Sequence, residues 1–152
     1  MVEVKKILFP VDFTSSSKKV LPFARYLCEK LGASIHLIHV VRGAEDFTGF
    51  DMGAAWFASF EQELLKGAEK AMERFIDENL QDFPNGLDKS VVMGDVVEEI
   101  LKMAGQVGAD MIVIGTHGRK GLEKIVFGSV AREVVKRADI PVLTVNPFKT
   151  KV

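Results

Sequence analysis

The segment from Gly115 to Ser129 has the residue types needed to bind phosphates. It carries four glycines in its first 14 residues and ends on a hydroxyl side chain. Glycine allows close approach of a ligand to the backbone, and a helix that starts at Gly128-Ser129 would direct N–H groups and a positive dipole end toward an anion. Arg119 and Lys120 add charge nearby. The bland alternative is that the glycines only turn the chain and that Ser129 is an ordinary N-cap.

The spacing in this segment differs from the two common glycine motifs for nucleotides. Lys120 stands where GxxxxGK[ST] requires its second glycine, and His117 stands where GxGxxG requires one. The motif is therefore of another kind. His117 lies in the loop itself, where contact with a phosphate is the expected role and catalysis is not.

An acidic residue, Asp12, follows the first apolar run and precedes the hydroxyl-rich segment 14–17. Two interpretations stay open. Asp12 could be a ligand for a ribose, a base or a metal ion, or it could cap the helix that follows. No second His or Cys stands at metal-ligand spacing from His117, so we expect no zinc site. Cys28 falls on the apolar side of the first helix and is interpreted as a core residue.

Apolar periodicity predicts strands and helices in alternation. The expected strands are residues 4–11, 34–41, 89–93, 110–114 and 140–145, with a helix after each of the first four. Residues 42–55 have no clear period and are expected to form a mobile loop. Phe57, Phe60 and Phe75 share one face of the second helix, where we expect helix-to-sheet packing.

Such an alternation indicates βαβ units, and hence an α/β fold with a parallel sheet covered on both faces. We expect one domain over residues 1–152. Ligands of open parallel sheets bind beyond the carboxyl ends of the strands. The segments that this rule selects for function are residues 12–17, 40–43, 94–95 and 115–129.

Composition excludes several classes of protein. The 152 residues are 47% hydrophobic, which excludes disorder, and the formal net charge of −1 argues against general nucleic-acid binding. No apolar run reaches the ~18 residues of a membrane helix, and the start of the chain lacks a signal peptide's apolar stretch, so we expect a cytoplasmic protein.

Charge is distributed unevenly along the chain. Residues 43–80 carry nine acids and three bases, net −6, whereas residues 115–152 carry eight bases and three acids, net +5. An anionic ligand is therefore expected at the C-terminal part.

The chain resembles the universal stress protein family over nearly its whole length. Most specific is the G-2x-G-9x-G-S spacing from Gly115 to Ser129, which is typical of the ATP-binding branch of that family. Residues 6–14 are similar to the family's opening strand and acidic turn, and residues 138–145 to its last strand.

This resemblance implies a three-layer sandwich, a Rossmann-like adenine-nucleotide fold with a five-stranded parallel sheet in the order 3-2-1-4-5. Pro10 and Asp12 would line the nucleoside end. The backbone of Val40 would contact adenine, with Ile114 packed nearby. The residues implied at the phosphates are Gly115, Gly118, Gly128 and Ser129, bordered by His117, Arg119 and Val130.

The function implied is that of an ATP-binding stress-response regulator, a nucleotide-dependent switch or sensor. Mg²⁺ or Mn²⁺ would accompany the triphosphate, held by the phosphates with Asp12 or Ser129 near. We find no carboxylate, Gln or Arg besides Asp12 that is suited to hydrolysis, so we assign no catalytic residue. Slow ATP hydrolysis stays open as the alternative.

The resemblance also implies a homodimer through antiparallel pairing of residues 140–145, since an apolar edge strand needs a partner. A further protein partner stays open. The remote alternative is a receiver-type phosphoacceptor domain, whose pattern Asp12, Asp95, Thr116 and Lys149 mimic. However, the usual acidic pair is absent, and Asp95 is better interpreted as the cap of the third helix.

Overall fold

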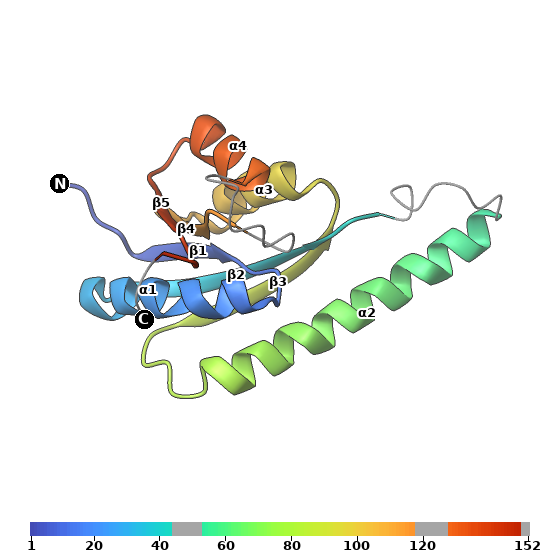
Figure 1. The fold of residues 1–152 in the computed structure, drawn as a ribbon, viewed down its shortest axis with the longest axis horizontal. Coiled ribbons are helices and arrows are strands. Elements are labelled where there is room, and N and C mark those ends of the chain that lie inside the picture. Colours follow the sequence, from blue (N-terminus) through green and yellow to red (C-terminus); the bar gives the residue numbers. More distant parts are fainter. Residues whose placement is uncertain (44–52, 118–127, 150–152) are drawn as a thin grey trace.

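The computed structural model describes residues 1–43, 53–117 and 128–149. They form a single α/β unit in which one sheet separates two layers of helices (Figure 1). Residues 44–52 of the expected mobile loop, and Gly118 and Arg119 of the glycine-rich segment, lie outside the described residues.

The sheet has five parallel strands in the order β3-β2-β1-β4-β5, which confirms the predicted topology. In chain order the strands are β1 (Lys6–Pro10), β2 (Ser34–Val41), β3 (Leu87–Met93), β4 (Met111–Gly115) and β5 (Val142–Val145). The first and fourth strands are therefore neighbours at the centre, where the strand order reverses.

Four helices cover the sheet, namely α1 (Ser15–Leu31), α2 (Ala54–Asn79), α3 (Val96–Val107) and α4 (Ser129–Arg137). Helices α1 and α2 bury Val20 and Phe75 against one face of the sheet. Helices α3 and α4 bury Ile100 and Val134 against the other. The two separate clusters of buried side chains explain why the sheet strands read as continuous apolar runs.

The expected strands 4–11, 89–93 and 110–114 are shifted by one or two residues at their ends, and two further boundaries differ for identifiable reasons. The last strand begins at Val142 rather than at residue 140. Pro141 has no N–H to donate, although its carbonyl oxygen still accepts a bond from the Ile112 amide at 2.9 Å. Helix α2 begins at Ala54, inside the expected 42–55 loop, with Gly53 as its N-cap.

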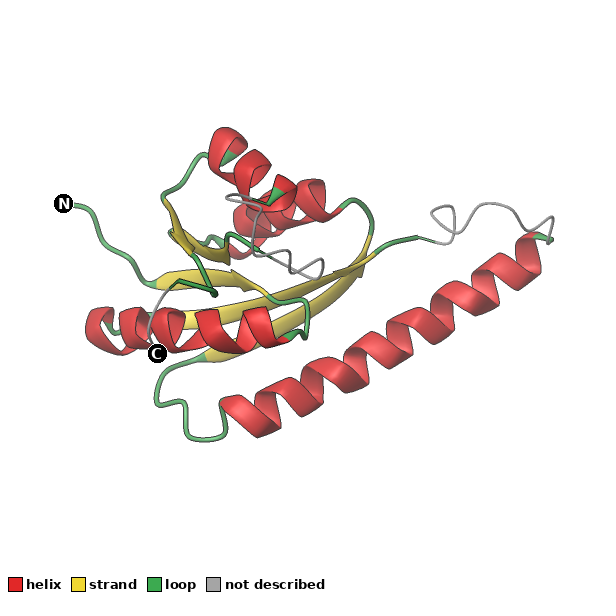
Figure 2. Cartoon of the chain, in the orientation of Figure 1, coloured by secondary structure: helices red, strands yellow, loops and turns green. Residues whose placement is uncertain are grey.

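The aromatic stripe of α2 packs on the sheet only in its C-terminal half. Phe75 is 3% exposed and belongs to the core, whereas Phe57 and Phe60 are only partly buried and belong to neither described core cluster. A helix of 26 residues is about 39 Å long and extends past the end of the sheet (Figure 2). The expectation of helix-to-sheet packing is therefore wrong for Phe57 and Phe60, where Trp56 instead stacks on Phe60 at 5.1 Å.

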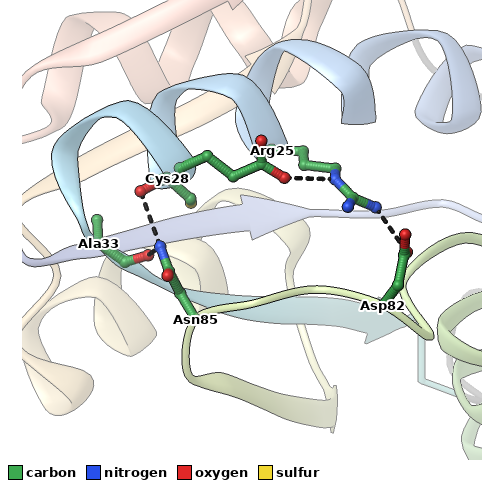
Figure 3. Close-up of polar contacts among 6 residues, drawn as sticks. Arg25, Cys28, Ala33, Asp82 and Asn85 are labelled. Carbon is green, nitrogen blue, oxygen red and sulfur yellow. Dashed lines mark hydrogen bonds and ion pairs between the residues drawn. The ribbon is translucent and has the colours of Figure 1, made fainter.

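The connection before β3 is tied to the end of α1 (Figure 3). The Asn85 side-chain amide donates to the carbonyl oxygens of Cys28 and Ala33, both at 2.9 Å. On the exposed side of the same connection, Arg25 forms an ion pair with Asp82 at 3.0 Å. These contacts hold the loop from α2 to β3 against the beginning of β2.

Candidate functional site

The predicted segments meet at the carboxyl edge of the sheet. The register of β1 with β2, continued two residues beyond Pro10, brings Asp12 level with Val40. The register of β1 with β4, continued four residues beyond Leu8, brings Asp12 level with Thr116. Residues far apart in sequence thus share one edge, as the topology requires.

A cavity of about 260 Å³ lies at this edge, between the end of β2 and the N-termini of α3 and α4. Its walls are formed by Arg42, Asp95, Val96, Val97, Ser129, Val130 and Glu133. Ser129 and Val130 were expected from the motif. Arg42 and Glu133 were not, although Arg42 lies in the predicted 40–43 segment and Glu133 is one helical turn after Ser129.

Asp95, in the predicted 94–95 segment, was expected to cap the third helix, and it has that role. Its Oδ1 atom accepts a bond from the Glu98 amide at 3.0 Å, at the first turn of α3. Its presence in the cavity wall adds negative charge to a region that also contains Arg42 and Glu133. The cavity is therefore mixed in charge rather than uniformly basic, and its carboxylates can accept hydrogen bonds from hydroxyl or amino groups of a ligand.

The two described ends of the glycine-rich segment are joined by a backbone hydrogen bond at Gly128. The Gly128 amide donates to the Thr116 carbonyl oxygen at 2.6 Å. A Cβ built on Gly128 would lie 2.7 Å from that same oxygen, a distance at which the backbone must shift. Glycine is needed here because the chain approaches itself closely, a reason the spacing alone did not reveal.

Gly115 is packed closely against helix α1 and the backbone of His117. A Cβ at this position would meet the Val20 side chain of α1 at 3.1 Å and the His117 carbonyl oxygen at 3.3 Å. Neither Gly115 nor Gly128 has a left-handed backbone, since the described glycines with positive φ are Gly32, Gly94 and Gly108. The two motif glycines therefore serve close packing rather than a tight turn.

Helix α4 opens directly onto the cavity. Gly128 is the N-cap and, as a glycine, has no side chain to cap the helix; Ser129 is the first helical residue. The interpretation of Ser129 as an ordinary N-cap is therefore wrong, and its exposed hydroxyl lies in the cavity wall. The first N–H groups of a helix lack intrahelical acceptors and attract anions.

Asp12 organises the turn between β1 and α1. Its Oδ1 atom accepts bonds from the Thr14 amide at 3.0 Å, the Thr14 hydroxyl at 2.6 Å and the Ser17 hydroxyl at 2.7 Å. Among the described residues no hydrogen bond ends on Oδ2. The N-cap of α1 is Thr14, so the expectation that Asp12 caps this helix is wrong; its carboxylate instead holds the turn before the helix, with Oδ2 still available to a ligand.

The residue after Asp12 has a strained backbone. Phe13 has φ +63°, the only described non-glycine residue with positive φ. Its ring lies against His39, with centroids 4.2 Å apart, and the His39 Nδ1 atom is 2.7 Å from the Val11 carbonyl oxygen. Such strain persists only where the surroundings enforce it and is frequent at binding sites.

His117 does not line the cavity. It is 6% exposed, its Nδ1 atom is 2.7 Å from the Thr116 hydroxyl, and its ring meets Phe148 edge-on at 5.1 Å. That His117 borders the phosphates therefore stays a prediction, and the described contacts of its ring are with Thr116 and the C-terminal turn. A single-sequence pattern cannot distinguish a loop histidine that faces a ligand from one that faces the chain's own C-terminal turn.

The one cysteine of the chain, Cys28, has a structural role. Burial raises the pKa of the Cys28 thiol to about 11, which confirms that Cys28 is a core residue. In the described ranges no cluster of three His, Cys, Asp or Glu side chains is arranged to hold a metal ion. Within the same ranges, none of the helices combines the length and apolarity needed to cross a bilayer.

Comparison with known proteins agrees with this architecture. Residues 3–146 match the Universal stress protein family, and the chain belongs to that family. It is 32% identical over 157 residues to the universal stress protein MJ0577 of Methanocaldococcus jannaschii, covering 95% of this chain and 96% of the relative. The solved MJ0577 structure has a TM-score of 0.84 at 29% identity, and the match covers 99% of this chain and 100% of that chain.

Two more distant structures share the fold. A universal stress protein from Archaeoglobus fulgidus in complex with dAMP has a TM-score of 0.53 at 23% identity, covering 95% of this chain and 98% of that chain. A universal stress protein in complex with cAMP has a TM-score of 0.60 at 17% identity, with the same coverage of 95% and 98%. The family assignment favours a universal stress protein over the receiver-type domain that was the remote alternative.

Proposed function

We propose that this universal stress protein binds ATP and acts as a nucleotide-dependent switch or sensor in a stress response. The observation that carries the proposal is the start of α4, where the N-cap Gly128 has no side chain and the next two residues, Ser129 and Val130, line the cavity. A helix start without a side-chain cap has N–H groups to offer to phosphate oxygens. The distant relatives solved with dAMP and cAMP support an adenine nucleotide as the ligand class.

In this proposal the phosphates lie at the start of α4, bound by the backbone amides of its first turn and by the Ser129 hydroxyl. The Arg42 guanidinium is near. Pro10, Asp12 and the backbone of Val40 contact the nucleoside. Val130 borders the site. Asp95 and Glu133 line the same cavity as Ser129 and Arg42. Their carboxylates would repel phosphate but can accept hydrogen bonds from ribose or adenine donors.

A divalent cation fits this arrangement only in part. The described residues offer no three-ligand cluster, so Mg²⁺ or Mn²⁺ would be held mainly by the phosphates themselves. The Asp12 carboxylate and the Ser129 hydroxyl are the protein groups suited to reach it. When bound, the cation would neutralise phosphate charge.

Binding is proposed over turnover. Hydrolysis needs a group that orients water and one that stabilises the transferred phosphoryl. Asp12 Oδ1 is already engaged by Thr14 and Ser17, which ties the carboxylate to the turn. Slow ATP hydrolysis is the second candidate, since Oδ2 stays available.

Calorimetry with Mg·ATP tests the binding site. We expect Gly128→Val to abolish binding, because the new side chain displaces the Thr116 carbonyl and with it the start of α4. Ser129→Ala removes only a hydroxyl and should weaken binding about tenfold, as the loss of a hydrogen bond to a charged group does. Gly67→Ala is the matched control, since a Cβ there meets nothing within 4 Å.

Unchanged affinity in both site variants would contradict the assignment. Phosphate release by the wild type should stay far below the ~1–100 s⁻¹ of kinases. Fast, saturable release would instead favour the ATPase alternative.

We also propose a homodimer through β5. This strand pairs with β4 on one side only, and its Leu143 side chain is 40% exposed. An apolar edge strand is an aggregation hazard unless another strand covers it.

A further inference from the structure

The C-terminal turn that follows β5 lies against the beginning of the glycine-rich segment. The Phe148 amide donates to the Asn146 side-chain oxygen at 3.0 Å, which closes the turn. The Phe148 ring then meets the His117 ring at 5.1 Å with an interplanar angle of 85°. This edge-to-face arrangement is among the favoured geometries for aromatic pairs.

Thr116, the residue before His117, connects three parts of the site. Its amide donates to the Val145 carbonyl of β5 at 2.9 Å, and its carbonyl accepts from the Gly128 amide at 2.6 Å. Its hydroxyl lies 2.7 Å from His117 Nδ1. Both Thr116 and His117 are 6% exposed. Displacement of His117 would therefore displace the oxygen on which the start of α4 is fixed.

We propose that Phe148 is a positioning residue for the ligand site. By packing against His117 it fixes the Thr116 carbonyl, and that carbonyl fixes Gly128 and the amides at the start of α4. Phe148 touches no ligand; the C-terminal turn sets the affinity for phosphate through two intermediate residues. The affinity part of this inference rests on the proposed nucleotide function, whereas the positioning part rests on geometry alone.

A second contact to the same ring serves as a control. The Lys19 ammonium of α1 lies 5.7 Å from the Phe148 ring centroid, and Lys19 is exposed. A cation–π contact at an exposed site is weak. Removing the Lys19 charge leaves the ring on His117, so it should not move the glycine-rich segment.

The test uses the full chain and two readouts, the affinity for Mg·ATP and amide hydrogen exchange at Gly128 without ligand. We expect Phe148→Ala to weaken binding about three- to tenfold, the effect of losing one aromatic contact. Gly128 exchange should become faster by a similar factor. Phe148→Tyr keeps the ring and should bind like the wild type. Lys19→Met should change neither readout by more than about twofold.

Asn85→Ala separates positioning from general destabilisation. It removes two hydrogen bonds on the opposite side of the molecule and should leave Gly128 exchange unchanged. Unaltered Gly128 exchange in Phe148→Ala would overturn the positioning role. Unaltered affinity beside faster exchange would overturn the effect on the ligand. If the wild type binds no ATP, the proposed function and the affinity part fail together, and the exchange result alone decides the positioning part.

Discussion

At the residue scale, the glycine motif is explained by the chain's own packing as well as by a ligand. A Cβ at Gly128 would force the Thr116 carbonyl to shift, and a Cβ at Gly115 would be tight against Val20 of α1, before any ligand binds. The two glycines therefore serve the packing of the chain at both ends of the segment. The proposed phosphate binding uses the start of α4 that Gly128 positions.

A buried histidine in strand β2 makes stability depend on pH. Burial lowers the pKa of His36, with Lys6 lowering it further and Asp88 opposing, and its Nε2 atom lies 2.8 Å from the Ser90 hydroxyl. The unfolded chain therefore takes up the proton first. The stability contribution of neutral His36 is complete above about pH 6.5 and is lost as the pH falls toward the lowered value.

We expect the free energy of unfolding by urea to decrease between pH 7.5 and 5.5, by at most about 1.4 kcal/mol per pH unit from this one group. His36→Gln keeps a hydrogen-bonding group beside Ser90 but does not titrate, so its decrease should be smaller. An equal loss in both proteins would contradict the role of His36.

At the scale of elements, the residues that follow β1, β3 and β4 each contact or cap the helix that comes next in the chain. Asp12 bonds to the first turn of α1, Asp95 caps α3, and Gly128 caps α4. Among the described helix starts, the N-cap side chain accepts a backbone bond at α3, whereas the N-caps of α1, α2 and α4 make no such bond. An anion is proposed at α4 because its first residues, Ser129 and Val130, line the cavity.

The loop before β3 provides an element-scale prediction. Asn85→Ala leaves the carbonyls of Cys28 and Ala33 without their donor and should lower the free energy of unfolding by about 1–3 kcal/mol. Asp82→Asn removes only the exposed pair with Arg25 and should lower it much less. Urea denaturation compares the two; a larger effect from Asp82→Asn would contradict the tether.

At the scale of the whole molecule, the parallel sheet leaves β5 as an edge. The carbonyls of Pro141 and Val145 point toward β4, where they accept bonds from Ile112 and Thr116. Backbone groups alternate along a strand, so the N–H of Thr144 points away from β4. It is the group that a second copy would use.

We therefore expect light scattering to report twice the 16.8 kDa mass of one chain at micromolar concentration. Thr144→Pro removes the outward N–H without removing a bond to β4 and should shift the mass toward the monomer, whereas Thr144→Val should not. A monomeric wild type would refute the dimer.

Periodicity and motif spacing were sufficient for the strand sequence and for the segments that form the site, because both depend on local repeats of about 2 and 3.6 residues. They failed where contacts span the fold. Phe57 and Phe60 repeat like Phe75 but lie beyond the end of the sheet, which only the relative lengths of α2 and the strands determine.

The sequence by itself determined the alternation of strands and helices, the polar residues at the strand ends and the resemblance that supplied the strand order. Only the tertiary structure decided that Arg42 and Glu133 share a cavity with Ser129, and that the His117 ring packs against Phe148. The physical reason is that side-chain direction at the end of a strand depends on neighbours from distant parts of the chain, which no local pattern encodes.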